Sequence, residues 1–270
     1  MRKIRKSLAS LFTWVLVLAF FFPVLWMFIN SFKTEQLAST IPPSFIFEPT
    51  LKEFGIAMDR GMADYLVHSL VASVSSTLLV LLLAFPAAYA LSIRPIKNVQ
   101  DALAFFISTR FMPAAASILP LYMIFKTLGV LDNVGALSLV YAAMNLPIAV
   151  WMMRSFLSEV PVELVEASQI DGANLRVEMS RVVLPIVMPG IAAVALICFI
   201  FSWNEYFLAN LLTSFDAGTT PPFLGSFVDG RGLFLGSLSA AATIAALPVI
   251  IAGWLAQKQL VRGLAMGAIK

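Results

Sequence analysis

Long apolar segments alternate with short polar connections along the whole chain. Five of these segments lack Asp, Glu, Lys and Arg, and a sixth contains a single charged residue, Arg110. The five charge-free runs are 7–32, 65–93, 133–153, 182–204 and 232–257, and the interrupted run is 102–125. An α-helix needs about 20 apolar residues to cross a hydrocarbon core of ~30 Å. The pattern therefore predicts an all-α membrane protein with six transmembrane helices.

The predicted spans form one transmembrane domain over residues 1–270. Their approximate bounds are 8–30, 65–92, 102–125, 134–153, 186–212 and 236–257. The larger connections are then 31–64, 154–185 and 213–235. Pro42, Pro43 and Pro49 lie in the first of them, so we expect residues 33–64 to be extended and rich in turns rather than helical.

The composition supports this class of protein. Hydrophobic residues make up 60% of the chain and charged residues 12%, whereas a soluble domain carries about 25% charged residues. Lipid cannot hydrogen-bond the backbone, so helices are the expected spanning structure. The first apolar run is too long for a cleaved signal peptide, and we interpret it as the first span. The single cysteine, Cys198, excludes an intramolecular disulfide.

The distribution of Lys and Arg predicts the orientation, because short cytoplasmic loops are enriched in these residues. With the N-terminus inside, twelve Lys and Arg fall on the cytoplasmic side and five on the outer side. Both ends of the chain are then cytoplasmic, 31–64 and 213–235 are external, and 154–185 is cytoplasmic. The net charge of +3 follows from this bias and does not indicate a nucleic-acid partner.

The polar connection 154–185 is predicted to contain a helix, a sharp turn and a second helix. Pro161 suits the first turn of a helix, and Glu163 lies near the positive end of its dipole. Gly172 comes where a residue in the left-handed conformation ends that helix. One face of the first helix would carry Leu164, Ala167, Ser168 and Asp171. Such a loop is either a solvated connector between two spans or a docking element for a partner.

Motifs in this loop and elsewhere resemble the permease subunits of bacterial ABC importers. Glu166-Ala167-Ser168 with Gly172, followed after nine residues by Val182-x-Leu184-Pro185, resembles their loop signature. Ser168 stands where Ala is usual and Val182 where Ile is usual. Five further segments resemble the carbohydrate-uptake, maltose-type branch of the type I importers. They are Asp171-Gly172-Ala173, Leu184-Pro185-x-x-x-Pro189-Gly190, Ser108–Pro113, Phe201–Tyr206 and Gln257–Leu264.

The resemblance implies that the chain lies in the lipid bilayer of the bacterial inner membrane and that it has several protein partners. They are a second, related permease subunit, two cytoplasmic ATPase subunits and an external solute-binding protein. The loop helix would sit in a groove of the ATPase and couple nucleotide binding to alternating access. The residues implied in this coupling are Glu163, Glu166, Ala167, Ser168, Asp171, Gly172, Ala173, Leu184 and Pro185. The implied C-terminal contact with the ATPase is Gly267, Ala268, Ile269 and Lys270.

The chain has no phosphate-binding G-x-x-x-x-G-K-[ST] motif, so it is predicted not to hydrolyse ATP by itself. The resemblance implies a transport subunit rather than an enzyme. We expect no cofactor in this chain, and ATP and Mg²⁺ would be bound by the ATPase subunits. No metal site is predicted either, because the one histidine, His68, is not accompanied by H-E-x-x-H or C-x-x-C patterns.

Polar side chains within the predicted spans are candidates for the solute path. An ionisable residue at membrane depth costs on the order of 2.5–3.5 kcal/mol when it faces lipid, so it should face a cavity or a partner. Packing between helices and snorkelling to the interface can also place such residues in a span. The candidates for the solute path, or for the seam with the second permease subunit, are Arg110, Tyr141, Asn145, Trp203, Asn204 and Glu205.

Two other classes of protein are compatible with a six-helix membrane chain. An ion-driven secondary transporter of small polar solutes would also place polar residues in broken helices, yet it leaves the loop signature unexplained. An intramembrane hydrolase would need a serine with a histidine or paired aspartates at membrane depth, and the chain has no G-x-S-x-G pattern. If the chain is an importer subunit, its C-terminal motifs resemble permeases for polyols such as sorbitol or mannitol, and other sugars remain open.

Overall fold

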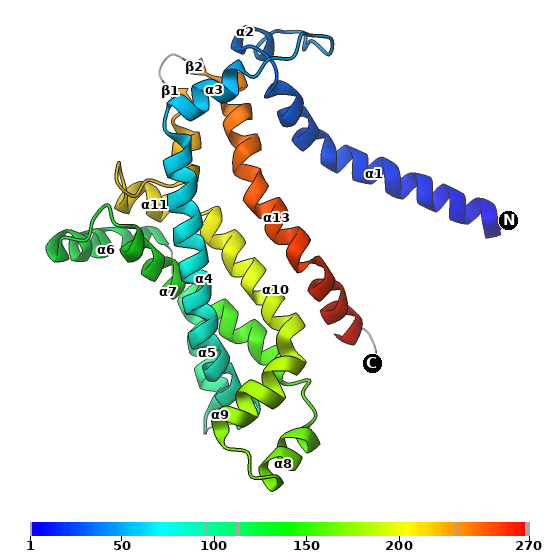
Figure 1. Cartoon of the computed structure of the whole chain (residues 1–270), viewed down its shortest axis with the longest axis vertical. Helices are drawn as coiled ribbons and strands as arrows, with labels where there is room; N and C mark the ends of the chain where they lie inside the picture. Colours follow the sequence, from blue (N-terminus) through cyan, green and yellow to red (C-terminus); the bar gives the residue numbers. More distant parts are fainter. Residues whose placement is uncertain (1, 95–96, 112–113, 230–231, 268–270) are drawn as a thin grey trace. The chain divides into compact units, whose positions relative to one another are not determined.

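The computed structural model describes residues 2–94, 97–111, 114–229 and 232–267. The chain divides into two compact units. The first unit combines Met1–Asp64 with Phe223–Leu247, and the second combines Tyr65–Pro222 with Pro248–Lys270. Two long helices, α4 (Met62–Ser92) and α13 (Leu235–Gly267), pass from one unit into the other. Figure 1 shows the order of the elements along the chain.

The first unit contains α1 (Arg2–Asn30), the short helices α2 (Glu35–Ala38) and α3 (Lys52–Asp59), and the first part of α13. Strands β1 (Val228–Asp229) and β2 (Gly232–Leu233) pair antiparallel. The prediction of an extended, turn-rich 33–64 segment is wrong for α2, which lies before the prolines, and for α3. The three prolines of that segment all precede this helix, so they do not interrupt it.

Two carboxylates join the short helices of the first unit to the start of α13. Glu35 Oε2 accepts the backbone N–H groups of Gly236 at 3.1 Å and of Ser237 at 3.2 Å. Glu53 accepts the Ser237 hydroxyl at 2.5 Å and the Glu35 N–H at 3.1 Å. A carboxylate at the N-terminus of a helix satisfies unpaired backbone donors and favours the helix dipole. These contacts therefore fix α2 and α3 against the first turn of α13.

The second unit is built on α4, α5 (Val99–Arg110), α6 (Ala114–Leu128), α7 (Val134–Leu157) and α10 (Leu184–Trp203). Smaller elements complete it: α8 (Val162–Ile170), α9 (Leu175–Val177), the π-helix η1 (Glu178–Val183) and α11 (Phe207–Leu212). The short helix α12 (Thr220–Gly225) begins in this unit and ends in the first one. Its main core is an apolar cluster that joins α4, α5 and α7 to α8, η1 and α10. Gly190 of α10 packs against the Phe156 ring of α7, where a Cβ atom would come within 2.6 Å of Phe156 Cδ2.

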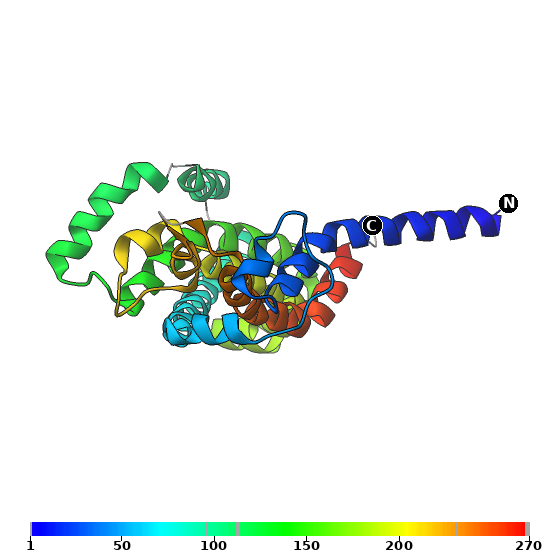
Figure 2. The ribbon, with the colours of Figure 1, turned by 90° about the horizontal axis from the view of Figure 1, so that it is seen from above.

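Within the described residues, five helical segments are long and apolar enough to cross a membrane. They correspond to the first, second, fourth, fifth and sixth predicted spans: Ser10–Asn30, Met62–Ser92, Val134–Leu157, Leu175–Trp203 and Leu235–Gln259. The predicted third span, 102–125, is instead divided into α5 and α6, which run in clearly different directions in Figures 1 and 2.

The predicted fifth span, 186–212, is also divided. Helix α10 ends at Trp203, and a new helix, α11, begins at Phe207. The backbone between them leaves the helical hydrogen-bonding pattern, and Glu205 caps the start of the second helix. Apolar composition alone does not reveal such a break, since the residues of α11 are as apolar as those of a continuous span.

Candidate functional site

The polar connection between α7 and α10 forms the helix, turn and helix expected from the sequence. Helix α8 follows Pro161 and ends at Asp171, and Gly172 then adopts the left-handed conformation with φ 79°. The next helical stretch begins after Asn174, whose side chain accepts the Val177 N–H at 3.0 Å. Asn is a favoured residue for capping a helix start. Local caps at both ends thus define a compact turn.

One side of α8 packs on the core and the other is exposed. Val165 is 4% exposed and belongs to the main apolar cluster, and Ser168 is 9% exposed. The Ser168 hydroxyl donates to the Val165 carbonyl at 2.8 Å. The exposed side carries Glu163, Leu164, Glu166, Ala167 and Asp171. This surface offers two glutamates and an aspartate around small and apolar groups.

The structure separates Ser168 from the face on which the sequence placed it. On the helix circumference Ser168 lies between Leu164 and Val165, and the packing of Val165 draws it inward. It therefore does not share the exposed surface of Ala167. Ala173 is half-buried in the turn, and its N–H donates to the Ser168 carbonyl at 2.9 Å.

The second helical stretch leads without interruption into the transmembrane part of α10. It comprises α9, then η1, then α10, so continuous helical backbone leads from the residues after the turn at Gly172 to Trp203. Leu184 is half-buried and Pro185 is exposed at the start of α10. A movement of this loop would therefore act on a membrane helix directly. Of the predicted C-terminal contact, Gly267 ends α13, and Ala268, Ile269 and Lys270 lie outside the described residues.

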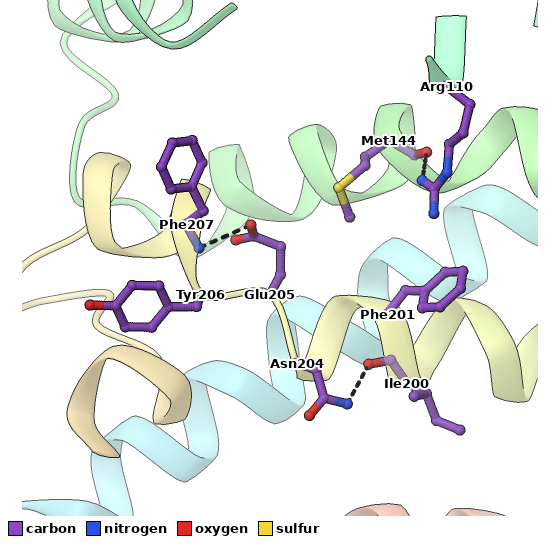
Figure 3. A pocket seen from close by; sticks show the side chains of 8 residues that line it. All are labelled: Arg110, Met144, Ile200, Phe201, Asn204, Glu205, Tyr206 and Phe207. Carbon is purple, nitrogen blue, oxygen red and sulfur yellow. Dashed lines mark hydrogen bonds between the residues drawn. The ribbon is translucent and has the colours of Figure 1, made fainter. Parts of the chain in front are cut away.

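A pocket of about 540 Å³ opens in the second unit beside α5, α7 and the break between α10 and α11 (Figure 3). Arg110 stands at its edge, where Nη1 donates to the Met144 carbonyl at 2.8 Å and the guanidinium lies 5.2 Å from the centre of the Phe201 ring. Its lining residues are Arg110, Met144, Ile200, Phe201, Asn204, Glu205, Tyr206 and Phe207.

Glu205 contributes its carboxylate to the backbone of α11 as well as to the pocket. Its two oxygens accept the N–H groups of Phe207, Leu208 and Ala209 at 3.0–3.1 Å. The negative charge is thus satisfied by the helix start. Among the described side chains no ion pair joins it to Arg110. Asn204 lies on the exposed side of the pocket, and its Nδ2 donates to the Ile200 carbonyl at 2.9 Å.

The other three candidates for the solute path lie in the interior and do not line this pocket. Tyr141, Asn145 and Trp203 are 1%, 0% and 4% exposed. Asn145 Nδ2 donates to Ser202 Oγ at 2.9 Å, and that hydroxyl lies 3.0 Å from Ser76 Oγ. Such hydrogen bonds join transmembrane helices. The structure therefore gives Asn145 a packing role between α7, α10 and α4, and Trp203 stacks on Phe199 at 5.7 Å.

Asp132, between α6 and α7, organises a second loop that the sequence did not single out. Its carboxylate accepts the N–H groups of four successive residues, 214–217, at 2.7–3.0 Å. Burial raises the pKa of this carboxyl, but the four backbone hydrogen bonds outweigh that effect and hold the pKa below its usual value. An aspartate in a turn is a weak signal in sequence, because its partners are more than 80 residues away.

Comparison with known proteins decides the family. Residues 62–265 match the family model of the binding-protein-dependent transport system inner membrane component. The chain belongs to this family. It is a multi-pass inner-membrane permease subunit of an ABC importer, and ATP hydrolysis resides in a separate subunit. Membership favours the importer over the ion-driven carrier and the intramembrane hydrolase.

Relatives and solved structures match the permease over nearly its full length. It is 35% identical to the probable ABC transporter permease protein y4oR of Sinorhizobium fredii, over 100% of this chain and 97% of that one. It is 30% identical to the diacetylchitobiose uptake system permease protein DasC of Streptomyces coelicolor, over 95% and 94%. Its fold is similar to that of a chain in a bacterial ABC transporter for alginate import, with a TM-score of 0.77, 21% identity, and coverage of 96% and 97%.

Proposed function

We propose that this permease imports a sugar, a polyol or a sugar derivative that a solute-binding protein delivers, and that α8 couples it to the ATPase. A second, related permease subunit would complete the membrane pore, and two ATPase subunits would bind ATP and Mg²⁺. The positive-inside bias supports cytoplasmic chain ends, with the 154–185 loop on the side of the ATPase. The C-terminal residues Gly267 to Lys270 would form a further contact with it.

The exposed face of α8 carries this proposal. The helix is anchored by Val165 in the core, and the exposed Glu163, Glu166 and Asp171 leave charged groups free for a partner. Ala167 lies among them and allows a close approach. The turn at Gly172 joins α8 to the helical stretch formed by α9, η1 and α10. A shift of α8 imposed by the ATPase would therefore reach the membrane helices and bias them between inward-open and outward-open states.

The pocket beside Arg110 supports the assignment of the solute class. It combines three aromatic rings, from Phe201, Tyr206 and Phe207, with the polar groups of Arg110 and Asn204. Aromatic faces suit the apolar faces of sugar rings, while amide and guanidinium groups suit hydroxyls. We assign to this pocket the contribution of the permease to the solute path. The sugar-related name of the diacetylchitobiose relative supports the same class.

Charge reversal on α8 tests the coupling role. Glu166→Lys should abolish uptake of the solute carried by the neighbouring binding protein, while the chain remains in the membrane, and Gly172→Val should do the same. Asp101→Lys is the matched control, since it reverses an exposed carboxylate on α5 outside the loop. Uptake and recovery of the ATPase with the tagged permease are measured together. Normal uptake by both loop variants would refute the proposal.

A further inference from the structure

Among the described side chains, Arg94 and Glu178 form the single ion pair. Arg94 Nη2 lies 2.9 Å from Glu178 Oε2, and the two side chains are 50% and 0% exposed. A buried carboxylate is costly unless charged or polar partners compensate for its lost hydration. Here the compensating charge comes from the half-exposed Arg94.

A third element meets the same oxygen. Gln169 Nε2 on α8 donates to Glu178 Oε2 at 3.1 Å. Arg94 lies two residues beyond the end of α4, and Glu178 is the first residue of η1. One carboxylate oxygen therefore connects the loop helix, the end of a membrane-spanning helix and the base of α10. The other oxygen, Oε1, is buried and has no hydrogen-bond partner among the described residues.

The helix that carries Glu178 is itself irregular. Residues 178–183 form a π-helix between α9 and α10. Such segments are rare and are frequently found at functional sites. Apolar contacts continue the connection, since Val165 of α8, Val183 of η1 and Val187 of α10 belong to one cluster. The junction thus lies where α8 is joined to the membrane part by an adaptable segment.

We propose that Glu178 is the positioning residue of energy coupling: through Gln169 and Arg94 it holds α8 to the bases of α4 and α10, so that they move together. The inference rests on the proposed docking of α8 to the ATPase. Without the junction α8 still docks, because its exposed face is unchanged, but the adaptable π-helix absorbs the movement. The ATPase then responds to nucleotide while the membrane helices do not.

Hydrogen exchange in the assembled transporter tests this role without requiring the solute. The full complex with its binding protein is compared before and after trapping with ATP, Mg²⁺ and vanadate. In the wild type, trapping should change the amide exchange rates of α8 and of the cytoplasmic ends of α4 and α10. We expect a change of about fivefold or more, which corresponds to the lower end of ordinary allosteric coupling. In Glu178→Gln the change in α8 should persist and the changes in α4 and α10 should disappear.

Further variants separate positioning from folding. Arg94→Gln removes the same ion pair from its half-exposed side, so it decides the matter if Glu178→Gln fails to assemble. The matched controls are Lys97→Gln and Asp101→Asn, which remove an exposed cation and an exposed carboxylate nearby. Both should behave as wild type.

The outcomes distinguish the two proposals. Unchanged responses of α4 and α10 in Arg94→Gln and Glu178→Gln would overturn the role of Glu178. A wild-type α8 that does not respond to trapping would overturn the docking of α8 itself, and with it this inference. Loss of the α4 and α10 responses, with the α8 response and ATPase recovery retained, is the result expected from a positioning role.

Discussion

Gly172 allows a sharp prediction, because a side chain at this position meets a backbone constraint and no steric one. The residue joins α8 to α9 with φ 79°, and a Cβ atom built on it meets no heavy atom within 4 Å. The effect of a substitution should therefore follow the cost of the left-handed conformation alone. Asn, Ala and Val are the informative replacements.

The magnitude follows from the backbone. The left-handed conformation costs an ordinary L-residue about 1–2 kcal/mol, which corresponds to a change of about 5–30-fold in a folding equilibrium. Asn tolerates this conformation better than Ala does, and the β-branched Val tolerates it worst. Uptake should be highest in the wild type and should fall from Gly172→Asn to Gly172→Ala to Gly172→Val. If the turn must form for coupling, Gly172→Ala should lose about 5–30-fold in uptake.

The assay is solute uptake by the reconstituted transporter, together with recovery of the ATPase and the thermal unfolding midpoint. Gly129→Ala is the matched control. Gly129 also has a positive φ, 67°, with no heavy atom within 4 Å of a built Cβ, but it lies between α6 and α7. The Gly129→Ala variant should have a lower unfolding midpoint than the wild type but should recover the same amount of ATPase. The reasoning fails if Asn is worse than Ala, or if Ala and Val both transport as the wild type does.

Two further predictions concern the loop that Asp132 organises and the pocket beside Arg110. Because the pKa of Asp132 is lowered in the folded state, its stabilising effect is present above the unfolded pKa of about 3.9 and is lost as pH falls through the folded value. Asp132→Asn should lower the free energy of unfolding by about 1–3 kcal/mol at neutral pH. The difference in unfolding midpoint between this variant and the wild type should disappear below about pH 4. A difference that does not depend on pH would contradict this. Arg110→Gln should reduce uptake about tenfold or more by removing a charged hydrogen-bond donor from the pocket, with ATPase recovery unchanged; uptake equal to wild type would exclude Arg110 from the solute path.

The sequence alone determined the class of the protein and the local form of its polar loop. Apolar runs of sufficient length predict spanning helices because backbone groups in lipid must be hydrogen-bonded, and a helix satisfies them within its own segment. The same holds for the turn at Gly172 and for the start of α8 directly after Pro161, since the local backbone conformation depends on adjacent residues. These features required no knowledge of which helices are neighbours.

Only the tertiary structure decided which polar residues face a cavity and which face another helix. Asn145 and Arg110 looked alike in sequence, yet one bonds Ser202 in the interior and the other lines a pocket. Glu205 caps α11 within a segment whose composition is that of one continuous apolar span. Likewise, Glu178 meets Arg94, 84 residues away. Hydrophobic periodicity records only the average surroundings of a helix, whereas the partner of a polar group depends on which distant segments pack beside it.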